Sequence, residues 1–288
     1  PLRRVGSEMC IRDSPSAVPG PIPVRTARLT ETSFMTDPRA ATEALLQARR
    51  SRDWIAVLPD GARPQDEAEA YAIQDAVAAA LAPEQGGIAA WKVGAANAEA
   101  PPFAAPILAG TLRFDDSPFA PGFFQVMGVE AELAYRMGRD LPPRAEPYAP
   151  EEVLDAVASL HPAIEIADTR FMGLNTTDRL SHLADQQSHG ALIVGPALAD
   201  WRGVVPTAQP FILRLNGQVA AEGRGGNPGG DPARLLHWMA NHAAARTGGL
   251  KAGDVVTTGS CCGAIPVPPG TAVEAEFPGI GTVRTAIG

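Results

Sequence analysis

The chain has 288 residues, of which 45% are hydrophobic and 19% charged, so it can bury a core of useful size in one large domain or two modest ones. Its formal net charge of −8 and the lack of a Lys/Arg cluster with interleaved aromatic residues argue against a nucleic-acid surface, and no apolar run is long enough to cross a bilayer. Three cysteines, two of them adjacent, make no disulfide framework, so we expect a reducing cytoplasm.

The first 34 residues differ from the rest of the chain. They are rich in Pro, Ser, Thr and Arg, show no hydrophobic periodicity and contain no continuous apolar stretch of the kind found in secretory signals. The stretch Ser-Glu-Met-Cys-Ile-Arg-Asp-Ser at 7–14 resembles a translated sequencing adaptor. We therefore expect residues 1–34 to be a non-native or disordered extension, with the native protein starting at Met35.

Residues 35–86 are predicted to form a helical N-terminal region. Asp37-Pro38 fits an N-cap followed by proline at the first helical position, and it leads into a helix over 40–50. A second helix is predicted over 64–81, where apolar positions are spaced for one face. Gly86-Gly87 ends this region.

Residues 87–288 are predicted to form a catalytic, β-rich domain. Strands are expected over 88–93, 124–137, 163–167, 191–194, 211–216, 218–221, 254–258, 271–277 and 281–286, with a hairpin turn at Asn216-Gly217. Helices are expected over 150–160 and 232–245, and loops over 95–110 and 223–230. Helices early and strands late favour an α+β fold over a regular βαβ repeat.

Glu130 and Glu132 lie two apart in an apolar segment that has no basic residue before Arg136. On a strand, side chains two apart point to the same face, so both carboxylates aim at one spot. Two like charges in apolar surroundings repel unless something positive lies between them, and a divalent cation is the simplest such partner. On a helix the two would lie about 200° apart and both could be solvated, so the pair alone leaves both interpretations open.

Glu165 supplies a third candidate ligand, because it lies between Ile164 and Ile166 in a predicted strand. A charged residue there is rarely buried unless it is paired or bound to a metal, and a salt bridge to Arg170 is the alternative. Three carboxylates with no Cys or His companion suit a hard cation, Mg²⁺ or Mn²⁺. Three protein ligands on an octahedral ion leave three positions for substrate and water, which is a catalytic arrangement.

Lys92 lies between Trp91 and Val93 in a predicted strand. Partial desolvation would lower the pKa of its ammonium toward acid–base use, whereas an edge-strand lysine with its head in water is the commoner alternative. Ser260 lies on a turn of small residues whose backbone N–H groups could hold a carboxylate, or which is an ordinary hairpin turn. His182 and His189 flank a polar loop and are interpreted as surface or structural residues.

Taken in order, these segments resemble the hydratase/decarboxylase branch of the fumarylacetoacetate hydrolase superfamily. The resemblance runs from about Ala68 to the C-terminus. It rests on segments that include Trp91-Lys-Val-Gly94, Val129-Glu-Ala-Glu-Leu-Ala134, Pro162-Ala-Ile-Glu-Ile-Ala-Asp-Thr-Arg170, Asn216-Gly217, Thr258-Gly-Ser260 and Val267-Pro-Pro-Gly270. The family fold consists of helices followed by a mixed β-roll or β-sandwich, and its members form homo-oligomers.

The resemblance also implies roles for single residues. It implies that Glu130, Glu132 and Glu165 hold Mg²⁺ or Mn²⁺, and that Lys92 serves in acid–base catalysis. Asp185 matches an Asp-Asn-Ala segment beside the family's active site. We therefore expect Asp185, together with the Ser260 turn, to bind substrate.

The chain departs from the family pattern at several positions. Family hydratases carry an acid in a Pro-Asp-Tyr/Phe-Gly turn, where this chain has Pro106-Ile-Leu-Ala-Gly110, with Leu108 in place of any acid. Asp115 or Asp116 are the candidates to compensate. Gln186 replaces the asparagine that follows the family aspartate, so the substrate is less secure than the metal site.

The resemblance implies a metal-dependent lyase that adds water to a small 2-hydroxy-2,4-dienoate, the tautomer of a 2-oxo-4-enoate, in aromatic catabolism. A 2-oxo-3-hexenedioate (4-oxalocrotonate) decarboxylase is the nearest alternative, and an acylpyruvate hydrolase is a third. From a different class, a non-catalytic protein that binds 2-oxo acids is also compatible with the missing acid.

Overall fold

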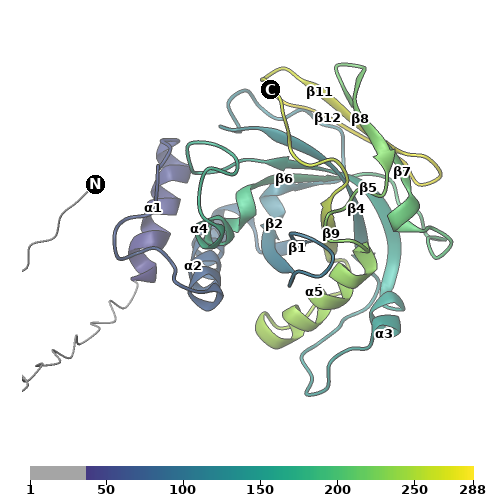
Figure 1. Ribbon diagram of the computed structural model, residues 1–288, viewed down its shortest axis with the longest axis horizontal. Helices are drawn as coiled ribbons and strands as arrows, with labels where there is room; N and C mark the ends of the chain where they lie inside the picture. Colours follow the sequence, from purple (N-terminus) through teal and green to yellow (C-terminus); the bar gives the residue numbers. More distant parts are fainter. Residues whose placement is uncertain (1–36) are drawn as a thin grey trace, which may run out of the picture. The chain divides into compact units, whose positions relative to one another are not determined.

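The computed structural model describes residues 37–288, so the predicted N-terminal extension lies outside the described residues. Two helices come first, α1 (Pro38–Ser51) and α2 (Glu67–Gln85) (Figure 1). The Asp37 carboxylate accepts a hydrogen bond from the backbone N–H of Arg39, which confirms the predicted N-cap. The second helix begins later than predicted, because the Asp66 carboxylate caps it by accepting from the backbone N–H of Glu69.

A mixed sheet forms the centre of the protein and curls around its concave side (Figure 1). Its strands are β1 (Ile88–Gly94), β2 (Phe103–Leu108), β3 (Leu112–Arg113), β4 (Gly128–Met137), β5 (Val157–Ala167), β6 (His189–Val194), β9 (Val255–Ser260) and β10 (Ile265–Pro266). The order is β2-β1-β9-β4-β5-β6-β3, and β10 pairs with β4. The β1–β9 and β3–β6 pairs are parallel and the others are antiparallel.

A second, antiparallel sheet packs on the first. Its order is β12 (Gly281–Ala286), β11 (Ala272–Phe277), β7 (Pro210–Leu215) and β8 (Gln218–Arg224). The core between the two sheets includes Ile164 and Ile166 from β5 and Leu213, Val273 and Phe277 from the second sheet. The predicted α+β fold, with helices followed by a mixed β-roll or sandwich, is confirmed.

Three further helices complete the fold, α3 (Pro150–Leu154), α4 (Arg179–Ala184) and α5 (Pro232–Arg246). Helix α2 contacts α1 and α4, and these three group together in Figure 1, while α5 packs on β1 and β9. A separate core that includes Leu45, Ile73, Val77 and Phe171 holds the helical side. None of the helices within residues 37–288 has the length and apolarity that a membrane span requires.

Two predicted elements were wrong, and proline placement explains both. Part of the expected loop over 95–110 is strand β2, which pairs only with β1, so the missing N–H of Pro106 costs nothing at this free edge. The helix from Pro150 ends at Leu154, and β5 follows and runs through Pro162. The carbonyl of Pro162 accepts from the N–H of Gly195, which lies beyond the end of β6. The N–H that Pro162 lacks is therefore not needed for the hydrogen bonds between β5 and β6.

Strand register decides which side chains meet in the sheet. Glu130 of β4 lies opposite Glu165 of β5, and Glu132 of β4 lies opposite Ser260 of β9. Strand β1 lies on the far side of β9 and places Lys92 opposite Thr257. Four neighbouring strands therefore bring these residues to one region of the concave face.

A buried ion pair next to this region is expected to stabilise the fold. The Arg170 Nε lies 2.6 Å from the Asp185 Oδ1, and both side chains are buried. We predict that Arg170→Met lowers the free energy of unfolding in urea by about 3 kcal/mol, because the Asp185 charge loses its main partner inside the protein.

The matched control is Arg179→Gln, which breaks an exposed pair with Glu67 and is expected to cost less than about 1 kcal/mol. Equal losses in the two variants would contradict the structural importance of the Arg170–Asp185 pair.

Candidate metal centre and its cavity

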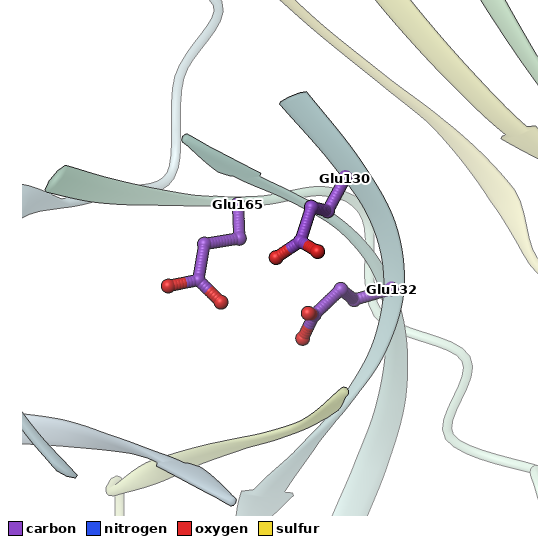
Figure 2. A group of neighbouring side chains, drawn as sticks. All are labelled: Glu130, Glu132 and Glu165. Carbon is purple, nitrogen blue, oxygen red and sulfur yellow. The ribbon is translucent and has the colours of Figure 1, made fainter. Parts of the chain in front are cut away.

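Three carboxylates converge on the concave face of the main sheet. Figure 2 shows Glu130 and Glu132 rising from β4 and Glu165 from β5, with their oxygens pointing toward one another. One oxygen from each residue lies within 4.8 Å of the other two. Glu132 and Glu165 are each 1% exposed, and Glu130 is partly buried. The extended Glu-Ala-Glu segment therefore aims both carboxylates at one spot, as the sequence predicted.

The cluster carries more negative charge than its surroundings balance. Burial and the Glu165 charge raise the pKa of Glu130 to about 7, and burial with both neighbouring carboxylates raises the pKa of Glu132 well above its ordinary value. Burial would also raise the pKa of Glu165, but Lys92 and His189 outweigh it and lower that pKa. One ammonium among three carboxylates leaves a net negative charge in a desolvated site.

The arrangement fits a hard divalent cation. The Oε2 atom of Glu165 is buried and has no hydrogen-bond partner within residues 37–288. Three carboxylate oxygens within reach of one point, an excess of charge and an unpartnered buried oxygen are the features that Mg²⁺ or Mn²⁺ would complete. Zn²⁺ fits less well, because no cysteine or histidine belongs to the cluster.

Lys92 contacts the cluster directly. Its Nζ forms an ion pair with the Glu165 carboxylate and donates to the carbonyl of Gln187 at 3.1 Å. Strand β1 lies between β2 and β9, and the Lys92 side chain is 12% exposed, so it is not an edge-strand lysine with its head in water. Burial lowers its pKa, but the three glutamates outweigh burial and raise it. The expected net lowering of the Lys92 pKa is therefore wrong, because the neighbouring glutamates favour the charged ammonium.

Ser260 lies beside the carboxylates, at the end of β9. Its Oγ accepts from the backbone N–H of Cys262 at 3.3 Å. The neighbouring Gly259 has a left-handed φ of 93°, and its N–H donates to Glu132 at 3.2 Å. The hydroxyl of Thr257 also donates to Glu132. Part of the turn's donor capacity therefore orients a carboxylate of the protein itself.

Asp185 does not line the same cavity. It is fully buried, and its carboxylate accepts from Arg170 Nε at 2.6 Å, Arg49 at 3.3 Å and the Thr169 hydroxyl at 3.2 Å. Its backbone carbonyl accepts from Arg170 as well, at 3.1 Å. Asp185 lies two residues before Gln187, whose carbonyl accepts from Lys92. Substrate binding by Asp185 stays a prediction, because Asp185 does not line the cavity.

The cavity has a volume of about 240 Å³, and its lining corrects the sequence interpretation of His182 as a surface or structural residue. His182 from α4, Asn175 and Asn227 line it together with the carboxylates, Lys92 and Ser260. Burial lowers the pKa of His182, and Lys92 lowers it further. Asn175 and Asn227 were not singled out from the sequence, because they reach the site from loop segments that only the tertiary fold brings there.

The acid missing near Leu108 is not replaced by either aspartate proposed from sequence. Asp115 and Asp116 are exposed and line a different surface depression, beside Arg284. His189 instead places its Nδ1 3.1 Å from the Glu165 Oε1 and its Nε2 3.1 Å from the Thr111 hydroxyl. His189 is 4% exposed, so its place is structural rather than on the surface.

Comparison with known proteins defines the class. Residues 109–288 match the family described as fumarylacetoacetate (FAA) hydrolase C-terminal, and the chain belongs to this family.

Several relatives and solved structures are similar to this chain. A 2-keto-4-pentenoate hydratase of Paraburkholderia xenovorans (strain LB400) is 28% identical over 254 residues, which cover 85% of this chain and 93% of that protein. A 4-oxalocrotonate decarboxylase of Pseudomonas putida is 29% identical over 132 residues, 46% of this chain and 50% of that protein. The 4-oxalocrotonate decarboxylase from Pseudomonas putida G7, complexed with magnesium and adipate, is 21% identical with a TM-score of 0.76, covering 86% and 96% of the two chains. This last likeness shows the shared fold.

We predict that Glu132→Gln weakens Mg²⁺ binding at least about tenfold in isothermal titration calorimetry, because one charged oxygen ligand becomes a neutral amide. Mg²⁺ should raise the Tm of the wild-type chain more than that of the variant at the same concentration. Without metal, the variant's Tm should equal or exceed that of wild type, since one source of like-charge repulsion is gone.

The control is Glu222→Gln, an exposed carboxylate on β8 that lies outside the cluster. Undiminished Mg²⁺ affinity in Glu132→Gln would rule out a metal centre at the three glutamates.

Proposed function

We propose that this chain is a divalent-metal-dependent hydro-lyase that adds water to a small 2-hydroxy-2,4-dienoate. The observation that carries the proposal is one cavity in which three carboxylates, a lysine and a neutral histidine converge. Relatives named 2-keto-4-pentenoate hydratase, which align over most of this chain, support the substrate class.

Glu130, Glu132 and Glu165 are the proposed metal ligands, and Mg²⁺ or Mn²⁺ is the proposed ion. When bound, the ion stabilises negative charge that develops on the substrate's oxygens. Binding of the cation also relieves the mutual repulsion of the three carboxylates. Their negative charges are therefore already arranged to bind a cation.

The remaining cavity residues handle the substrate and its protons. The 2-hydroxyl group of the dienoate loses its proton and C5 gains one, after which the hydroxyl of water bonds to C4 and the second proton of that water goes to C3. Lys92, protonated and held by Glu165 and the Gln187 carbonyl, is the proposed proton carrier at the dienol. His182, kept neutral by burial, is placed to accept a proton from the adding water.

Ser260 and Asp185 complete the proposed substrate site in different ways. The Ser260 hydroxyl lines the cavity beside Glu130 and is proposed to donate to the substrate carboxylate. Asp185 is proposed to act on substrate indirectly, by holding the segment that contains Gln187.

The charge of the cavity favours a hydratase over a decarboxylase of a dicarboxylate. Among the described residues that line it there is no arginine, and its lysine is paired with Glu165. Apolar side chains, Val93, Phe103 and Leu174, line part of the wall. The second carboxylate of 2-oxo-3-hexenedioate would enter this cavity without a cationic partner, whereas an uncharged diene end would meet apolar surface.

The family resemblance supports the wider setting of this proposal. We propose that the chain works as a homo-oligomer in the cytoplasm, in a pathway of aromatic catabolism. We also propose that the chain divides at residues 86–87 into a helical region and a catalytic β-rich region.

We predict that Lys92→Met lowers turnover of 2-hydroxypenta-2,4-dienoate by more than about 100-fold, measured as loss of the dienol chromophore in the presence of Mg²⁺. Mg²⁺ affinity should be kept or increased, because a cation next to the carboxylates is removed. Lys251→Met, which changes the second of the two lysines in the sequence, is the control and should keep wild-type turnover. Binding of the dienoate without turnover by wild type would instead identify a 2-oxo acid binding protein.

The preference for an uncharged substrate end is tested separately. Wild type should convert 2-hydroxypenta-2,4-dienoate with a kcat/KM at least about tenfold above that for 2-oxo-3-hexenedioate, since an unpaired buried charge costs more than a tenfold factor. Leu174→Arg should lower the KM for the hexenedioate by supplying a cation, and Leu174→Met should not. Rapid CO₂ release from the hexenedioate by wild type would assign a decarboxylase.

A further inference from the structure

A second cavity, also of about 240 Å³, lies away from the proposed reaction. Arg49, Arg52 and Arg170 line it, and we call it the arginine cavity. Among the described residues that line the two cavities, none is common to both. The proposed reaction leaves this cavity without a role.

The arginine cavity has an excess of positive charge. Three guanidinium groups face two nearby carboxylates, those of Asp168 and Asp185. Asp185 is paired with both Arg49 and Arg170, whereas Asp168 accepts from the backbone N–H groups of 125 and 126. Burial, and then the Arg170 charge, lower the pKa of Arg49 to about 9. Three guanidinium groups and two carboxylates leave one positive charge without a negative partner in the arginine cavity.

Hydrogen-bond donors are also left over in the arginine cavity. The Arg49 Nε is buried and has no hydrogen-bond partner within residues 37–288. The guanidinium of Arg52, at the exposed rim, has one acceptor among the described residues, the carbonyl of Phe123 at 3.3 Å. Buried donors in native proteins are nearly always satisfied, so an unpaired guanidinium N–H on a residue that lines the cavity indicates an absent acceptor.

Part of the lining of the arginine cavity is apolar. Leu108, Phe123 and Phe124 line it. The two phenylalanines pack edge to face at 4.8 Å between ring centroids, which makes a rigid apolar surface. A ligand that satisfies both parts has an anionic head with two acceptor oxygens and a short hydrocarbon tail.

We propose that the arginine cavity binds a small organic monocarboxylate, with its carboxylate at Arg49 and Arg52 and its tail against Leu108 and Phe124. A single negative charge balances the excess of one guanidinium, and planar carboxylates match the forked donors of arginine. This inference does not depend on the proposed function.

Residues 186–189 lie between the two cavities, so a ligand in the arginine cavity could affect the metal centre. The Gln186 side chain accepts from Arg49 at 2.8 Å on one side, and the Gln187 carbonyl accepts from Lys92 at 3.1 Å on the other. Gln186, Gln187 and Ser188 have left-handed φ values of 51°, 53° and 56°, which non-glycine residues rarely adopt. A carboxylate at Arg49 would therefore compete with Gln186 for a donor one residue away from the group that holds Lys92.

Calorimetric titration of the full chain with butyrate, butyramide and inorganic phosphate tests the proposal, in Mg²⁺ and in chelator. In chelator the glutamate cluster repels anions, so butyrate binding there reports the arginine cavity, and one butyrate per chain is expected. Arg49→Gln and Arg52→Gln should each weaken it about tenfold or more, by loss of a charge-assisted hydrogen bond. Arg50→Gln, an exposed arginine on the same helix that does not line the cavity, should have no effect.

Arg52 lies at the exposed rim, so Arg52→Gln should fold even if Arg49→Gln does not. Unchanged butyrate affinity in Arg52→Gln, or equal affinity for uncharged butyramide, would overturn the proposal. Phosphate binding tighter than butyrate would overturn the monocarboxylate class, because the apolar half of the cavity would then contribute nothing.

Discussion

Repulsion among three carboxylates, two of them buried and one partly buried, is the constraint around which this protein is built. Adjacent strands in register bring Glu130, Glu132 and Glu165 to one point, and Lys92 compensates only part of their charge. Two of the three pKa values are raised because burial and mutual repulsion disfavour ionisation. Keeping such a cluster costs stability in the metal-free chain, so the surrounding sheet must hold it rigidly. The extensive β4–β5 pairing provides that rigidity.

This fold places its clustered carboxylates and its clustered guanidinium groups in two different cavities. The cavity of the candidate metal centre concentrates carboxylates, and the arginine cavity, lined by Gln186 and His189 of the 186–189 segment, concentrates guanidinium groups. His189 and Gln187 belong to that segment and contact Glu165 and Lys92, while Gln186 contacts Arg49. Asp185 anchors the start of the segment through Arg170. The strained backbone between the cavities is thus held from both sides by ionic contacts.

Local patterns predicted most elements, and they were wrong where tertiary position overrides propensity. The N-cap at Asp37, the hairpin at Asn216-Gly217 and strands β9, β11 and β12 follow from short-range signals. Strand β2 and the start of β5 did not, because their prolines are tolerated only where no neighbouring strand requires their N–H. Whether a strand lies at an edge is a property of the sheet, which a local sequence pattern does not contain.

The sequence by itself determined the residues of the candidate site: two glutamates on one strand face, a third in an apolar strand, and a lysine. It also carried a family resemblance that the comparisons confirmed. The tertiary structure alone decided the surroundings of those residues. It placed His182 and Asn227 in the cavity, moved Asp185 behind it, and raised the pKa of Lys92 where local desolvation predicted a lowering. The physical reason is that strand periodicity is local, whereas electrostatic balance sums over residues that are distant in the chain and adjacent in space.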